Sequence, residues 1–314
     1  MAALRVPPII RFVGLRLVLA LPALWLILTM VFLLIHIVPG DPVAQMLGDG
    51  ARADDLQQLR HALKLDQPVQ VQYFDYIRDI LHGDLGQSFR FQQPVTRVIA
   101  DHYAATLQLS LVALAVCALI GIFGGILAAQ KRGTATDTTV SVLTLFGLSV
   151  PNFALGPVLM LVFAVILGWL PVTGRGGPAY FVLPALTLGA ALAAILTRMV
   201  RISVIEELSS DYVRTARAKG LTDSAVLFKH AFRNALIPIL TILGLQFGAL
   251  LAGTIVTETI FSWPGIGRLT VQAISARDYP LLQGCILVIS LSYVLVNLLT
   301  DVLYSVIDPR VRLS

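Results

Sequence analysis

Apolar residues gather in six long stretches of this sequence, and none of these stretches contains Asp, Glu, Lys or Arg. They span residues 17–39, 104–130, 139–167, 181–197, 235–257 and 281–300. A helix needs about 20 apolar residues to cross a hydrocarbon core about 30 Å thick. We therefore predict an all-α integral membrane protein with six transmembrane helices, forming a single membrane domain over residues 1–314.

The polar segment after the first stretch, residues 40–103, is the longest and has mixed polarity. Within it, residues 54–65 and 69–81 carry apolar side chains three or four positions apart, the spacing of one helix face. We expect short amphipathic helices that lie on the outer membrane face or pack against the helix bundle.

Three arginines precede the first apolar stretch, as they would in a secretory signal peptide: Arg5, Arg11 and Arg16. The apolar run is longer than the hydrophobic region of such a peptide, and no A-x-A-like cleavage site follows directly after it. The prediction is a first helix that is retained.

Lys and Arg are concentrated in alternate segments between the apolar stretches. The basic segments are the N-terminus, residues 131–132, the loop at 198–237 and the C-terminal tail. Because short cytoplasmic loops are enriched in Lys and Arg, both termini and loop 198–237 are predicted to be cytoplasmic, and residues 40–103 extracytoplasmic. The same sorting explains the net charge of +5 without a nucleic-acid partner.

Composition agrees with a chain that crosses the bilayer several times. Hydrophobic residues make up 57% and charged residues 13% of it, with a mean hydropathy of +0.82, whereas about 25% of the residues in soluble domains are charged. Loop 198–237 holds seven basic and four acidic side chains. Each charged side chain would cost about 2.5–3.5 kcal/mol of insertion free energy at the bilayer centre. We therefore predict that this loop does not cross the membrane.

The sequence contains no pattern of catalytic or metal-binding residues. None of the four lysines follows a glycine, so the chain has no Walker A motif. The five histidines are scattered, and Cys117 and Cys285 lie inside apolar stretches, where we expect them to pack between helices. We predict a non-catalytic chain without a metal or cofactor of its own, driven by a partner or an ion gradient.

A proton-coupled secondary transporter is an alternative of a different class. Such proteins place ionisable groups within the membrane, but here Glu258 and Asp301 lie near helix ends and the middle of each stretch has none. Glu258 either faces the transport path or caps its helix, and Asp301 is expected to be solvated or paired. A membrane scaffold that transports nothing is a further alternative.

Neutral polar residues inside the stretches are candidates for lining a pore: Ser149, Asn152, Gln246 and Asn297. Interhelical hydrogen bonding is the more common role of such residues. Pro151 and Pro157 interrupt the third stretch, and proline kinks a helix because it removes a backbone hydrogen bond. The kinked helix either borders a pore or serves packing.

The pattern within loop 198–237 is typical of a helix, a turn and a second helix. Helix-forming residues extend over 204–219, Gly220 can adopt the left-handed conformation that ends a helix, and Thr222 is a suitable N-cap. Small and basic residues alternate just before the turn. This combination suits insertion into a groove of a cytoplasmic partner, although a solvated basic loop has the same composition.

This segment resembles the EAA loop of ABC-importer permeases, whose short coupling helix docks on the ATPase subunit. The general pattern has Glu and Ala where this chain has Arg214 and Thr215, and its downstream I-x-L-P is absent at the usual spacing. The version here, T-A-R-A-K-G at 215–220 followed by H-x-x-R-N-A at 230–235, resembles the dipeptide/oligopeptide/nickel branch.

Further segments match that branch in order along nearly the whole chain. They are P-G-D-P at 39–42, L-D-Q-P at 65–68, G-D-L-G at 83–86, F-S-W-P-G-I-G at 261–267, R-D-Y-P at 277–280 and D-P-R at 308–310. The long first outer segment resembles that of the B-type subunit of the branch.

The resemblance implies a heterodimer with a second, homologous permease in the cell inner membrane. Two ATPase subunits would bind ATP and Mg, and an extracytoplasmic binding protein would deliver the substrate. Short peptides are the leading substrate, with chelated nickel or glutathione as alternatives in the same branch. The residues implied in ATPase coupling are Arg214, Thr215, Ala216, Arg217, Ala218, Lys219 and Gly220.

A turn near the outer end of the fifth stretch is a second candidate region. Its residues of interest are Glu258, Trp263, Pro264, Gly265 and Gly267. Gly and Pro favour a tight turn, and Trp is common at membrane interfaces. We expect a contribution to an outer gate or to docking of the binding protein, with simple turn formation as the alternative.

Overall fold

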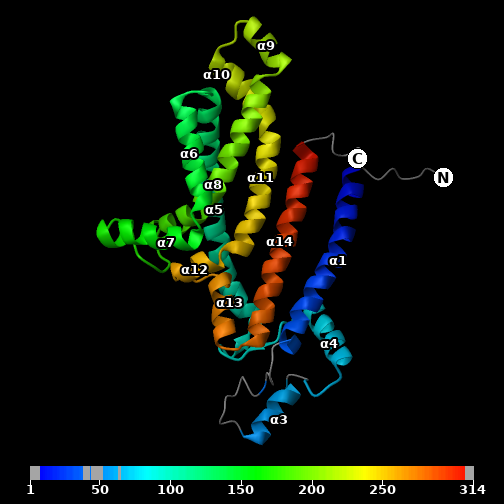
Figure 1. Cartoon of the computed structure of the whole chain (residues 1–314). Helices are drawn as coiled ribbons and strands as arrows, with labels where there is room; N and C mark the ends of the chain where they lie inside the picture. The colour runs from blue at the N-terminus through cyan, green and yellow to red at the C-terminus, as the bar shows by residue number, and fades with distance from the viewer. Residues whose placement is uncertain (1–7, 38–42, 44–51, 63–64, 308–314) are drawn as a thin grey trace, which may run out of the picture.

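The computed structural model describes residues 8–37, 43, 52–62 and 65–307. Long helices lie side by side in a bundle, with the short helices α9 and α10 at one end and α3 and α4 at the other (Figure 1). The helices are α1 (Pro8–Ile37), α3 (Ala53–Ala62), α4 (Val69–Leu81), α5 (Val95–Gln130), α6 (Ala135–Ser149), α7 (Asn152–Leu159), α8 (Ala179–Leu208), α9 (Asp211–Ala218), α10 (Asp223–Ala225), α11 (Phe232–Gly253), α12 (Ile255–Ile260), α13 (Ile266–Ser275) and α14 (Tyr279–Ile307). Two π-helical segments, η1 (Met160–Ile166) and η2 (Val226–Ala231), and a short antiparallel pair, β1 (Gln87–Ser88) with β2 (Gln93–Pro94), complete the described elements.

Five described helices are long and apolar enough to cross a membrane: α1, α5, α8, the α10–η2–α11 run and α14. A sixth span is present if the bent pair formed by α6 with α7 and η1 counts as one. The predicted all-helical, multispanning fold is confirmed. Several helices extend beyond their apolar stretches, because helical conformation continues where side chains become polar: α5 begins at Val95 and α8 ends at Leu208.

The third stretch is not one kinked helix, as the sequence suggested, but two helical segments at 104° to each other. The break falls at Val150–Pro151, where Val150 is extended and Pro151 precedes α7. A residue before proline is disfavoured in the helical region, which explains this position. Pro157 lies inside α7 without breaking it. As a result, α7 points away from the bundle (Figure 1).

Glycines allow α5 and α8 to pack closely at the centre of the bundle. A Cβ at Gly189 would lie 2.9 Å from the Ala113 carbonyl oxygen, and one at Gly125 would lie 2.7 Å from that of Thr197. Small residues at such positions let helix backbones approach within a membrane. The α5–α8 pair is therefore the framework on which α6 and α11 pack.

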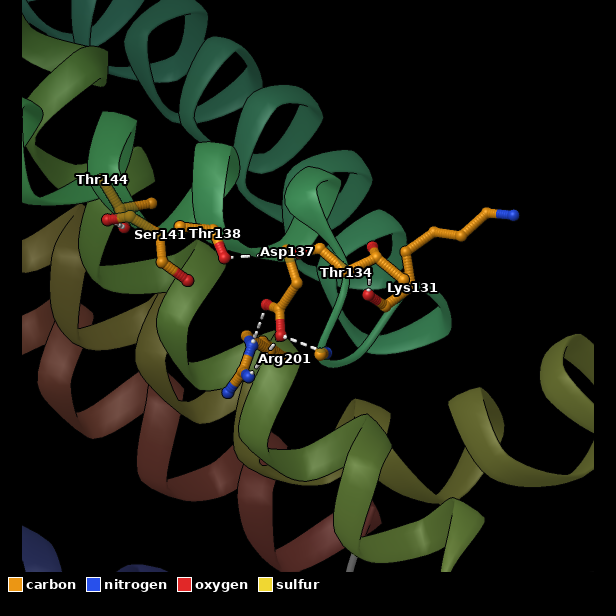
Figure 2. Close-up of polar contacts among 8 residues, drawn as sticks. Lys131, Thr134, Asp137, Thr138, Ser141, Thr144 and Arg201 are labelled. Atoms are coloured by element: carbon orange, nitrogen blue, oxygen red, sulfur yellow. Dashed lines mark hydrogen bonds and ion pairs between the residues drawn. The ribbon is translucent and has the colours of Figure 1, made fainter.

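An ion pair joins the start of α6 to α8. Arg201 donates from Nε to Asp137 Oδ1 over 2.7 Å and from Nη2 to Oδ2 over 2.8 Å. The Gly133 backbone N–H donates to the same carboxylate. Figure 2 shows the guanidinium of Arg201 facing Asp137, with the Lys131 side chain pointing away from the pair. Two parallel N–H···O bonds fix the orientation of the two helices as well as their distance.

The segment between α1 and α5 contains the two predicted short helices, as α3 and α4. Helix α4 packs against α1 through Tyr73, whose ring meets Phe32 edge-on at 5.2 Å and whose hydroxyl contacts Thr29 over 2.8 Å. The β1–β2 turn is tied to the region before α14, because Asp278 accepts hydrogen bonds from Ser88 Oγ and the Arg90 N–H. The P-G-D-P and D-P-R segments lie outside the described residues.

Candidate functional site

Helix α8 extends beyond the apolar region and carries residues 209–231, which we call the α9 segment. A single helix over residues 204–219 was expected, but it breaks at Ser209 and Ser210. Both hydroxyls donate to carbonyl oxygens of the preceding turn, at Ile205 and Glu207. Serines that bond to nearby backbone compete with helix continuation, which accounts for the break.

The predicted turn after α9 is confirmed in detail. Gly220 follows the C-cap Lys219 and has φ +78°, a conformation that glycine adopts without a steric penalty. Thr222 caps α10, since its Oγ1 accepts a hydrogen bond from the Ala225 N–H over 3.4 Å. These two residues fix the direction in which α9 projects from the bundle.

Helix α9 has one face packed on its own protein and one face in solvent. Val213 and Ala216 are buried against Val226, with Leu208 beside them. The other implied coupling residues are exposed: Arg214, Thr215, Arg217, Ala218, Lys219 and Gly220. The methyl group of Ala216 faces inward and only 7% of the residue is exposed, and its implied role in ATPase coupling stays a prediction.

Exposed ion pairs lie along the solvent face of α9. Arg214 Nη1 is 3.3 Å from Asp211 Oδ1, and Arg217 Nε is 3.5 Å from Asp223 Oδ1. Exposed ion pairs of this kind each contribute about 0–1 kcal/mol to the free energy of unfolding. They hold the cationic side chains loosely and leave them available to a partner.

Three large side chains of the α9 segment with apolar surface are exposed, and sequence analysis did not single them out. Tyr212 is 38%, Leu221 41% and Phe228 54% exposed. The Tyr212 hydroxyl donates to Glu207, and burial, followed by this hydrogen bond, raises the pKa of Tyr212 above its usual value. The sequence signal available for Tyr212 was its place next to Val213, off the i, i+3 spacing that Val213 and Ala216 share.

The second candidate region, residues 258–267, is built around a buried carboxylate. Glu258 is fully buried, and its Oε1 accepts from Thr106 Oγ1 over 2.6 Å while Oε2 accepts from the Arg268 N–H over 3.0 Å. Thr106 Oγ1 also accepts from the Ile266 N–H over 2.8 Å. Sequence reasoning singled out Glu258 but not Thr106, its partner on α5.

Gly265 and Gly267 are required by this arrangement. A Cβ at Gly265 would collide with the carboxyl group of Glu258 and with Thr106, and one at Gly267 would lie 2.7 Å from Ile255 Cα. Both glycines therefore make room for the carboxylate and the backbone around it. The structure brings together the predicted Glu258, Gly265 and Gly267.

Trp263 is also an interior residue. It is completely buried, its Nε1 donates to the Ala105 carbonyl over 2.9 Å, and Phe181 meets its ring at 4.6 Å. Pro264 is only half-buried. Docking of another protein on Glu258 or Trp263 would require this turn to open, so a role in gating or docking stays a prediction.

The four pore-lining candidates do not form one cluster. Gln246 accepts from Cys117 Sγ over 3.0 Å and donates to the Leu192 carbonyl over 3.1 Å, thereby linking α11 with α5 and α8. Asn297 on α14 lies against Gly248 of α11. Gln246 thus has the interhelical hydrogen-bonding role that was the alternative to cargo contact.

The other two candidates lie at the break between α6 and α7. The Ser149 hydroxyl donates to its own helix at the Leu145 carbonyl over 2.8 Å, and it is exposed. Asn152 Oδ1 is buried and has no hydrogen-bond donor among the described residues, and the same holds for Asn297 Oδ1. Asp301, expected to be solvated or paired, forms an ion pair with Arg16 over 3.0 Å.

Two family models match most of the chain. The model described as "Binding-protein-dependent transport system inner membrane component" matches residues 121–313, and the corresponding N-terminal model matches residues 9–110. The chain belongs to this family. It is thus the membrane-spanning, non-catalytic permease subunit of an ABC importer, and the inner membrane is its location.

Curated relatives of this family match over nearly their whole length. The glutathione transport system permease protein GsiC of Salmonella choleraesuis (strain SC-B67) is 44% identical, over 96% of this chain and 99% of that protein. GsiC of Escherichia coli (strain K12) is 43% identical over the same shares. These matches confirm the resemblance to the dipeptide/oligopeptide/nickel branch.

Solved structures of ABC transporters share the permease fold. A chain of the inward-facing MetNI methionine ABC transporter aligns with a TM-score of 0.57 and 19% identity, over 67% of this chain and 96% of that one. An amino acid ABC transporter with histidines aligns with a TM-score of 0.52 and 18% identity, over 68% and 94%. Because the chain belongs to the importer family, the alternatives of a secondary transporter and of a membrane scaffold are set aside.

Proposed function

We propose that this permease forms half of a translocation pore for short peptides, and that glutathione, itself a tripeptide, is the first substrate to test. The observation that carries this is the 44% identity to a glutathione permease over nearly the full length of both chains. A nickel chelate is the alternative substrate within the same branch. A second, homologous permease would supply the other half of the pore.

The exposed face of α9 is the proposed contact with the ATPase subunits. It combines flexible cations at Arg214, Arg217 and Lys219 with the apolar side chains of Tyr212 and Leu221. Partly apolar patches with basic residues are suited to protein contacts, because Tyr and Arg are enriched in interfaces. Two ATPase subunits would bind the ATP and Mg, and an extracytoplasmic binding protein would bring substrate to the opposite end of the bundle.

The proposed cycle is a rigid-body switch. When the ATPase subunits bind ATP and close, they would move the α9 segments of the two permeases. The pore would then change from the inward-facing to the outward-facing state, as interfaces with two stable arrangements do. In this orientation both chain termini are cytoplasmic, on the side that bears α9.

Uptake by cells that express the complete importer, and lack their own systems for these substrates, tests the proposal. Labelled glutathione, a dipeptide and a nickel chelate are compared. We expect peptide uptake that persists when the proton gradient is collapsed while ATP is maintained, and that is lost when the Walker lysine of the ATPase is replaced. Uptake of the nickel chelate without either peptide would refute the peptide assignment.

A further inference from the structure

A groove between α5, α6 and α8 is not used by either candidate region described above. One cavity of about 320 Å³ and a second of about 290 Å³ share the lining residues Val140, Thr144 and Thr197, so the two lie next to each other. On α8 the first cavity is lined as far as Ile202, toward α9, and the second as far as Ala190. We refer to the two adjacent cavities together as the groove.

The two ends of this groove differ in chemistry. The end near α9 is lined by Arg198 and Arg201, with Ser141 and Thr144 opposite them on α6. The other end is lined by small and apolar residues, among them Gly124, Gly147 and Ala190. Ala190 and Arg201 are eleven residues apart on one helix, which corresponds to about 16 Å.

The polar end of the groove carries more positive charge than the nearby acidic side chains neutralise. Arg201 is bound bidentately to Asp137, as Figure 2 shows. Arg198 is exposed and forms no hydrogen bond or ion pair with any residue that the structure describes. Lys131 and Arg132 lie in the neighbouring α5–α6 turn, and both are exposed. An anion at this end would find an unpaired guanidinium beside an oriented one.

We propose that the groove binds one anionic phospholipid, with its phosphate at Arg198 and one acyl chain along Leu145 and Leu148, which line the same cavity. Guanidinium groups match phosphate oxygens in geometry and charge, and basic pockets between transmembrane helices on the cytoplasmic side are suited to anionic headgroups. Leu145 and Leu148 are exposed apolar side chains, so an acyl chain would cover apolar surface beside Arg198. A bound lipid would fill the space between α6 and α8 next to the Asp137–Arg201 ion pair.

Native mass spectrometry of the purified importer, titrated with phosphatidylglycerol or with phosphatidylcholine of the same acyl chains, tests this assignment. We expect preferential retention of phosphatidylglycerol, weakened about fivefold by Arg198→Gln and restored by Arg198→Lys. Arg233→Gln is the matched control, because Arg233 is also exposed near the α9 end but does not line the groove. Equal retention of both lipids, or equal loss with Arg198→Gln and Arg233→Gln, would overturn the proposal.

A photocrosslinker at Val140, which lines both cavities, identifies the occupant directly. An adduct with the mass of a phospholipid supports the site. An adduct with a second protein chain would mean that the groove is a permease–permease contact, and an adduct with the labelled peptide would mean that it belongs to the substrate path. Either of these results overturns the lipid assignment.

Discussion

At the scale of single residues, the most demanding chemistry lies around Glu258. A buried carboxylate is costly unless it is hydrogen-bonded, and here Thr106 and a backbone N–H supply the bonds. The sequence singles out Glu258 because it is an acid at the end of an apolar stretch. It does not reveal Thr106, because a threonine more than a hundred positions away carries no signal of pairing.

Gly265→Ala should destabilise the protein. The added methyl group collides with Glu258 and Thr106, and overpacking of this kind costs about 1–3 kcal/mol. The melting temperature of the purified importer, followed by size-exclusion chromatography after heating, measures the effect. Gly253→Ala is the matched control, since a Cβ there meets nothing within 4 Å. Equal melting temperatures for the two variants would contradict the proposed packing.

Thr106→Val keeps the shape of the side chain but removes its hydroxyl. Glu258 and the Ile266 N–H then each lose a partner, and an unsatisfied buried polar group costs about 1–3 kcal/mol. A clear loss of thermal stability is expected, whereas Thr139→Val, at an exposed position that bonds only its own helix, should change little. A Thr106→Val protein as stable as the parent would show that these bonds are dispensable.

At the scale of elements, the α9 segment shows what local sequence determines and what packing determines. Gly220 ends one helix through its backbone conformation and Thr222 starts the next through its side-chain hydroxyl, and both were predicted. Which face of α9 is buried depends on Val226 and Leu208, which lie outside that helix. For that reason the sequence alone does not show that Ala216 lies on the buried face.

Gly220→Val should impair coupling without preventing insertion into the membrane. Valine is disfavoured at φ +78° by roughly 1–2 kcal/mol, so the end of α9 would shift. Reduced co-purification of the ATPase subunits and reduced uptake are expected. Gly83→Val is the control, because Gly83 follows the C-cap of α4 with φ +79° and is equally uncrowded, but lies at the other end of the bundle. Normal recovery of the ATPase subunits and normal uptake with Gly220→Val would contradict the proposed role of the α9 segment in ATPase coupling.

At the scale of the whole molecule, the apolar stretches predict the number and order of the helices because burial in lipid requires long apolar segments. They do not predict the 104° turn at Pro151, since the apolar character continues through it. The Asp137–Arg201 ion pair was likewise missed. Arg201 was interpreted only as a topological signal, and its partner lies on another helix.

The proposed orientation can be measured by cysteine labelling. Cys117 and Cys285 are both buried and should react little in the folded protein. A membrane-impermeant maleimide added to intact spheroplasts should label Gln57→Cys in α3 but not Ala218→Cys in α9, and inverted vesicles should give the opposite result. Labelling of both positions from the same side would refute the predicted topology.

Helix α8 runs from one candidate region to the other as one continuous helix. Its 30 residues correspond to about 45 Å. Phe181 near its first turn packs on Trp263, and Leu208 at its last residue packs on the α9 cluster. If the ATPase tilted α8 slightly at one end, the other end would thus move by several ångströms. The Trp263 turn would then change position with the nucleotide state through α8 itself, without a series of side-chain rearrangements in between.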